Sequence, residues 1–177
     1  EDKSDYKHMA AVGVTFLFLM SLRKELRNHS IFNNKKEPNL LSYLDLVALG
    51  TVCDVVELRE FNRLFVLKGL ELIHKRYHKG ISKLIDNSKL NTPPSSQDLG
   101  YIVGPQINAA SRIDDSSLAS KLLITNDPEQ IEKIGRKLFL LNEKRKLIQT
   151  KILELANEQA EIQKNSKYIL VYGENWH

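Results

Sequence analysis

The sequence contains a single cysteine, Cys53, among its 177 residues. One cysteine excludes an internal disulfide framework and is typical of a protein from a reducing cytoplasm. The longest apolar run, residues 9–20, is shorter than the roughly 20 residues that a membrane-spanning helix needs. The acidic residues before it are not typical of a signal peptide. We therefore expect a cytoplasmic protein without a membrane partner, whose first helix is buried.

The sequence also lacks the motifs of several enzyme classes. It contains no P-loop, dinucleotide-binding fingerprint, nucleophile elbow or CxxC pair. His74 and His78 have a spacing that can bind zinc, but no third ligand is near them and basic residues surround them. The composition is that of a globular protein, and the net charge of +4 favours polyanionic partners only weakly. Composition and motif searches alone give no complete catalytic site.

Apolar periodicity predicts a mainly α-helical chain. We expect helices over 9–27, 40–54 and 61–76 and a short helix from Ser116, with a tight turn at Gly104-Pro105.

The strongest pattern begins at Asp127, which can cap a helix that has Pro128 at its first position. Apolar residues spaced by three and four then continue from Ile131 to Ile162, which predicts one helix over 127–165. A coiled-coil dimer and a connector packed along a domain both fit this pattern. The run at 168–172 is typical of a strand, and a strand needs a partner.

The stretch YLDLVALGTVCDVVEL places Asp54 between apolar residues. Burying a carboxylate costs several kcal/mol unless it is paired. Mg²⁺ or Mn²⁺ would neutralise it, since carboxylates are their natural ligands. The alternatives are a helix cap or an ion pair with Arg59 or Arg63. Asp45, early in the same segment, is expected to face solvent.

A second stretch, GPQINAASR at 104–112, combines small residues with one guanidinium. Small residues let an anion approach the backbone, and arginine binds phosphate through two hydrogen bonds. The alternative is a helix-packing contact in which Arg112 pairs with Asp114 or Asp115. The residue pattern leaves both open.

These stretches, together with SLASKLLITNDPEQ and LNEKRKLIQ, resemble the RecJ family over nearly the whole chain. RecJ enzymes are single-strand-specific DNA exonucleases of the DHH phosphoesterase superfamily. The resemblance implies 5′-to-3′ hydrolysis of phosphodiester bonds in DNA recombination and repair, with two Mn²⁺ or Mg²⁺ ions as cofactors. The implied partners are single-stranded DNA, single-strand binding protein and a RecQ-type helicase.

The resemblance also implies an α/β parent protein in which a long helix joins a DHH domain to a DHHA1 domain. Residues 1–126 would be the C-terminal part of the DHH domain, 127–165 the connector helix and 166–177 the start of the DHHA1 domain. A connector role favours a monomer over a coiled-coil dimer.

The implied site residues are Asp54, as a catalytic metal ligand, and Asn108, Ser111 and Arg112, as phosphate contacts. The family usually has arginine where this chain has Gln106, so one phosphate contact would be missing.

Two further departures are milder, since the family usually has alanine at Cys53 and glycine at Ser111. No Asp-His-His motif occurs in the chain. One carboxylate cannot hold two ions about 4 Å apart, so we expect the chain alone to be inactive. A non-catalytic helical module that binds nucleic acid or a protein is the alternative function.

Overall fold

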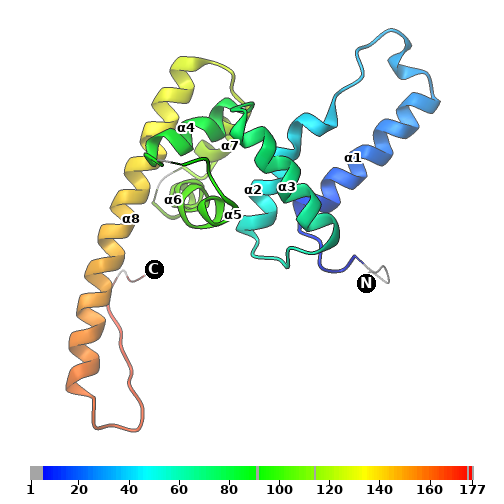
Figure 1. Cartoon of the computed structure of the whole chain (residues 1–177). Helices are drawn as coiled ribbons and strands as arrows, with labels where there is room; N and C mark the ends of the chain where they lie inside the picture. Colours follow the sequence, from blue (N-terminus) through cyan, green and yellow to red (C-terminus); the bar gives the residue numbers. More distant parts are fainter. Residues whose placement is uncertain (1–5, 91, 114, 175, 177) are drawn as a thin grey trace.

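The computed structural model describes residues 6–90, 92–113, 115–174 and 176, with only the backbone at 112 and 113. Within these residues the protein is helical and contains no strand, as Figure 1 shows. The prediction of a mainly α-helical chain is therefore confirmed. The strand predicted at 168–172 is not formed in this structure. No helix of the described part is long and apolar enough to cross a membrane.

The helices follow the predicted order with small shifts at their ends. The longer ones are α1 (Ala11–Asn28), α2 (Leu44–Cys53), α3 (Glu60–His74), α4 (Lys79–Asn87), α6 (Gly104–Ile113), α7 (Ser117–Ile124) and α8 (Pro128–Ile162). The short elements are the 3₁₀ turns η1 (Ile31–Asn33) and η2 (Leu40–Tyr43), the single turn α5 (Ser96–Asp98) and the π-helical turn η3 (Leu99–Val103).

Helices α2 and α3 pack unusually closely. A Cβ atom at Gly69 of α3 would lie 2.2 Å from the carbonyl oxygen of Leu44 and 2.3 Å from the Cβ of Ala48. This contact and the main core on its other side enclose α2, so that Asp45 has an exposed fraction of 0%. The prediction that Asp45 faces solvent is therefore wrong, because the whole circumference of α2 is covered at that level.

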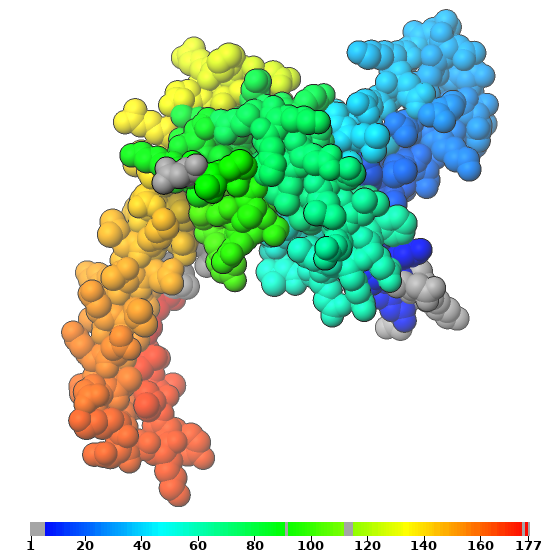
Figure 2. Space-filling model, in the orientation of Figure 1, coloured from blue at the N-terminus to red at the C-terminus, as the bar shows by residue number. Residues whose placement is uncertain are grey.

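Two hydrophobic clusters hold the described helices together. The larger one joins α2, α3, α4, η3, α6, α7 and the first half of α8. Its most buried members are Ile81, Leu84, Leu99, Val103, Ala110, Leu122 and Leu138. The smaller one attaches α1 through Phe16 and Phe65, whose rings meet edge to face at 5.4 Å. The core therefore lies between two projecting arms, α1 and the distal half of α8 (Figure 2).

Helix α8 begins as the sequence predicts. The carboxylate of Asp127 accepts a hydrogen bond from the backbone N–H of Glu129 at 2.9 Å, and Pro128 occupies the first helical position. The helix ends at Ile162, three residues before the predicted end at 165.

Only the first half of α8 belongs to the core, through Ile131, Ile134 and Leu138. Beyond Leu141 the apolar series becomes solvent-exposed, and α8 extends away from the other helices (Figure 1). The buried half is covered by α4, α6 and α7 of the same chain, so a coiled coil along the whole series is not available.

The C-terminal run returns along the distal half of α8. The side-chain amide of Gln163 exchanges two hydrogen bonds with the backbone of Leu170, at 2.8 and 3.1 Å. Gln159 makes the same pair with the backbone of Tyr172, at 2.7 and 3.0 Å. Two glutamines, rather than a neighbouring strand, therefore satisfy backbone groups of this extended run.

Candidate functional site

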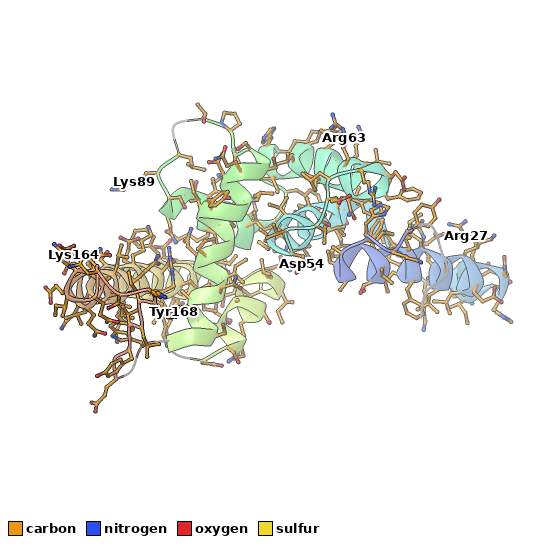
Figure 3. All side chains as sticks on the ribbon, turned by 90° about the horizontal axis from the view of Figure 1, so that it is seen from below. Arg27, Asp54, Arg63, Lys89, Lys164 and Tyr168 are labelled. Carbon is orange, nitrogen blue, oxygen red and sulfur yellow. The ribbon has the colours of Figure 1, made fainter. Side chains whose placement is uncertain are left out.

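Asp54 lies at the C-terminal end of α2, where its backbone N–H donates to the carbonyl of Gly50 at 2.9 Å. The side chain is exposed, so the cost of burying a carboxylate does not apply to it. Within the described residues its carboxylate forms no hydrogen bond or ion pair. Arg59 pairs with Glu57 instead, at 3.0 Å, and Figure 3 shows Arg63 well away from Asp54. Neither of the ion pairs considered for Asp54 is formed.

The helix end determines the electrostatics around Asp54. The last carbonyl groups of a helix carry partial negative charge, which favours a cation and disfavours an anion. The Asp54 carboxylate adds a full negative charge at this end without a cationic partner in the described structure. This arrangement attracts a hard cation, and Asp54 fits the role of one oxygen ligand. No group of three His, Cys, Asp or Glu side chains that could hold a metal gathers among the described residues.

Cys53 joins the two sequence motifs in space. Its Sγ lies 3.9 Å from the carbonyl oxygen of Leu99, and a Cβ atom at Gly104 would lie only 2.6 Å from that Sγ. Burial, and secondly the negative charge of Asp54, raises the pKa of the Cys53 thiol. The thiol is therefore neutral at pH 7, and a neutral thiol is a poor metal ligand.

The tight turn predicted at Gly104-Pro105 is wrong. Gly104 has φ −54° and ψ −46°, so η3 continues directly into α6. Pro105 lies in the first turn of α6, and because it has no N–H it donates no hydrogen bond to the preceding turn, η3. Glycine is needed at 104 for the close approach of Cys53 rather than for a turn.

Asn108 and Ser111 are both exposed on α6. The hydroxyl of Ser111 donates to the backbone carbonyl of Asn108 at 2.9 Å. Arg112 belongs to the same helix, but its side chain and Asp114 lie outside the described residues. The contact between Cys53 and Gly104 therefore brings the Asp54 loop to the start of the helix that carries these three residues.

Gln106 points in the opposite direction, into the core. Its amide group donates to the carbonyl of Leu84 at 3.1 Å, the hydroxyl of Ser88 at 2.9 Å and the carbonyl of Ile102 at 3.1 Å. In this chain the side chain at 106 therefore links α6 to α4.

The two histidines with zinc-like spacing serve other purposes. The Nε2 atom of His74 lies 2.9 Å from the carbonyl oxygen of Pro94. The Nδ1 atom of His78 faces the N–H of Ile81 at 3.5 Å and caps α4. The rings lie on either side of the α3–α4 turn and have separate partners.

The residue analysis did not identify Tyr101, which lies on η3 with 79% of its surface exposed. Tyr101 borders a hollow of about 350 Å³ lined by Val52, Cys53, Val55, Val56, Leu58, Ser96, Gln97, Gly100 and Tyr101. The hollow therefore takes part of its wall from the residues on both sides of Asp54.

No protein-family model matches the chain. Curated relatives are the single-stranded-DNA-specific exonuclease RecJ of Haemophilus influenzae, 34% identical over 97% of this chain, and that of Dickeya dadantii, 37% identical over 97%. The chain spans 31% of the length of each, about a third.

Solved structures of RecJ have the same fold over the matched region. One is an exonuclease RecJ bound to manganese, with a TM-score of 0.73 and 29% sequence identity. The match covers 88% of this chain and 38% of the RecJ chain. Another is RecJ from Thermus thermophilus in complex with Mn²⁺, with a TM-score of 0.62 and 30% sequence identity. That match covers 68% of this chain and 18% of the RecJ chain. Sequence and fold together relate this chain, over nearly all its length, to one part of the RecJ exonucleases.

Proposed function

We propose that the chain forms part of a metal-dependent 5′-to-3′ single-stranded-DNA exonuclease. The observation that carries this proposal is the exposed, unpaired carboxylate of Asp54 at a helix C-terminus, packed against the start of α6 through Cys53 and Gly104. Relatives named as single-stranded-DNA-specific exonucleases and RecJ structures with Mn²⁺ and Mg²⁺ support it.

In this proposal Asp54 provides one carboxylate ligand to Mn²⁺ or Mg²⁺. Such ions lower the pKa of a bound water and stabilise the charge that develops on the phosphate during hydrolysis. Asn108 and Ser111 bind the substrate phosphate from the exposed side of α6, and Arg112 is the third phosphate contact. The other metal ligands come from a segment that this chain does not contain, so the chain alone is inactive.

The domain division follows the same proposal. Residues 1–126 belong to the DHH catalytic domain, 127–165 form the connector helix and 166–177 begin the DHHA1 domain of an α/β protein. The extended run at 168–172 becomes a strand there, and exchanges its hydrogen bonds to Gln159 and Gln163 for bonds to a neighbouring strand. The whole protein is a cytoplasmic monomer whose partners include single-strand binding protein and a RecQ-type helicase.

The test is digestion of 5′-labelled single-stranded DNA in the presence of Mn²⁺, with and without an added segment that carries the Asp-His-His motif. We expect no release of nucleotides by the chain alone and release after the segment is added. Asp54→Ala should abolish the restored activity, whereas Asp86→Ala, an exposed carboxylate paired with Arg76 on α4, should retain it. Full activity of the chain alone, or of the reconstituted Asp54→Ala variant, would contradict the proposal.

A further inference from the structure

The hollow beside Asp54 has a chemistry that differs from that of a phosphate site. Most of its lining is apolar, and its nine lining residues include no aspartate, glutamate, lysine, arginine or histidine. The hydroxyl of Ser96 and the amide of Gln97 supply the other polar groups. Its ligand must therefore be uncharged and largely apolar, with a few hydrogen-bonding groups. A nucleobase meets this description, whereas a phosphate or a sugar does not.

The size and openness of the hollow fit such a ligand. Its volume of about 350 Å³ is at the lower end of the roughly 300–1,000 Å³ typical of small-molecule sites. The ring of Tyr101 is exposed at its edge and available for stacking. Exposed aromatic rings are the usual platforms for single-stranded nucleic acids, since every base has a π-face.

The hollow is also correctly placed relative to Asp54. Cys53 and Val55 both line it, and consecutive Cα atoms are about 3.8 Å apart, so the backbone of Asp54 runs along its rim. A nucleotide carries its base and its phosphate on one sugar. One nucleotide can therefore bring its base to the hollow while its phosphate is at Asp54.

Backbone strain at Val55 is a second observation that points to ligand binding at this rim. Val55 has φ 57°, the left-handed region that β-branched residues rarely adopt, and its side chain is 88% exposed. No burial of the Val55 side chain compensates for this conformation. Strained backbone of this kind clusters at ligand-binding sites.

We propose that the hollow formed by the Asp54 loop and η3 is a nucleobase subsite, in which Tyr101 stacks on the base of the nucleotide whose phosphate lies at Asp54. This inference rests on the proposed function, because it takes single-stranded DNA as the substrate. It adds a substrate-positioning residue, Tyr101, that holds the base rather than the phosphate.

The test measures binding of two fluorescently labelled oligonucleotides to the 177-residue chain with Mn²⁺ present. One is oligothymidylate, and the other is an abasic oligomer of the same length and charge. Tyr101→Ala should weaken oligothymidylate binding about tenfold, and Tyr101→Phe should retain it, since stacking needs only the ring. Neither variant should change binding of the abasic oligomer. Circular dichroism verifies that each variant is folded.

The control is Tyr77→Ala, because Tyr77 is also an exposed tyrosine but lies in the α3–α4 turn, away from the hollow. Equal binding of both oligomers by the unaltered chain, or equal losses in Tyr101→Ala and Tyr77→Ala, would overturn the subsite. Asp54→Ala separates this proposal from the metal site. If it leaves binding of both oligomers unchanged while Tyr101→Ala still discriminates them, the metal assignment fails and the subsite stands.

Discussion

At the scale of single residues, the two aspartates of the YLDLVALGTVCDVVEL segment have exchanged their expected environments. Asp54 is exposed and Asp45 is buried, although apolar residues flank both in the sequence. The Oδ1 atom of Asp45 accepts a hydrogen bond from the N–H of Leu46 at 2.8 Å, and its Oδ2 atom has no partner within the described structure. The buried, partly unsatisfied carboxylate of Asp45 therefore destabilises the folded state.

Asp45→Asn is expected to stabilise the protein at pH 7. Burial raises the pKa of Asp45, an effect only partly opposed by the hydrogen bond from Leu46 and by His78. The folded state then holds a proton that the unfolded state releases, so stability is greatest below the unfolded pKa of about 3.9 and falls as pH rises through the folded pKa. Asparagine has no proton to lose, so Asp45→Asn should raise the free energy of unfolding, measured in urea, by about 1 kcal/mol at pH 7 and by little at pH 3.

Asp115→Asn provides the opposite control. The hydroxyl and N–H of Ser117, and then Lys121, lower the pKa of Asp115 to about 2, so its contribution is present at pH 7 and lost only as pH falls towards that value. Asparagine there should lower stability at pH 7. If Asp45→Asn does not raise the free energy of unfolding at pH 7, or raises it equally at pH 3, the buried carboxylate of Asp45 is not destabilising.

The contact between Gly104 and Cys53 predicts a compensating pair of substitutions. Gly104→Ala places a Cβ atom 2.6 Å from the Sγ of Cys53 and should destabilise the protein by about 1–3 kcal/mol. Cys53→Ala removes that sulfur, and its own Cβ lies 3.9 Å from the new methyl. The double variant should therefore recover most of the loss in thermal unfolding. Additive losses would show that the two positions are not in contact.

At the scale of elements, the crossing of α2 and α3 depends on Gly69. Gly69→Ala would place a methyl 2.2 Å from a backbone oxygen of α2, which cannot move without shifting the helix. We expect a loss of about 1–3 kcal/mol in urea unfolding. Gly13→Ala on α1 is the matched control, because its nearest neighbour is the flexible methyl end of Met9 at 3.1 Å. Similar results for both variants would contradict this crossing.

The elements that local chemistry determines could be predicted, and those that depend on tertiary contacts could not. The start of α8 follows from Asp127 and Pro128, and the end of α2 at Cys53 follows from the weak helix formers before it. The burial of Asp45 depends on the approach of Gly69 from another helix, which no local pattern contains. The need for glycine at 104 likewise depends on Cys53, a residue 51 positions before it.

The candidate site was predictable to a similar extent. Asp54, Asn108 and Ser111 were identified by motif, and all three are exposed. Tyr101 was not identified, because an aromatic residue in an apolar stretch is normally part of the core. Only the packing of η3 against α2 shows that its ring faces solvent.

At the scale of the whole molecule, a compact helical core has two projecting arms (Figure 2). Both arms expose apolar side chains. On α1, Val14, Phe18 and Leu22 are exposed, and α1, η2 and α3 together line a mainly apolar hollow of about 500 Å³. Apolar surface of this extent is uncommon on monomeric proteins and marks sites of contact. The chain spans 31% of its curated relatives, so most of a RecJ-length protein lies outside the helices described here.

The central claim is that Asp54 is a cation ligand, and the most direct test is an NMR titration of the chain with Mn²⁺. Paramagnetic broadening reports even weak binding, which suits a site with one carboxylate. We predict that the amide signals of 53–56 broaden first, that Asp54→Asn abolishes this preference and that Asp86→Asn retains it. Broadening that is no stronger near Asp54 than near other exposed carboxylates, or that persists in Asp54→Asn, would contradict the account.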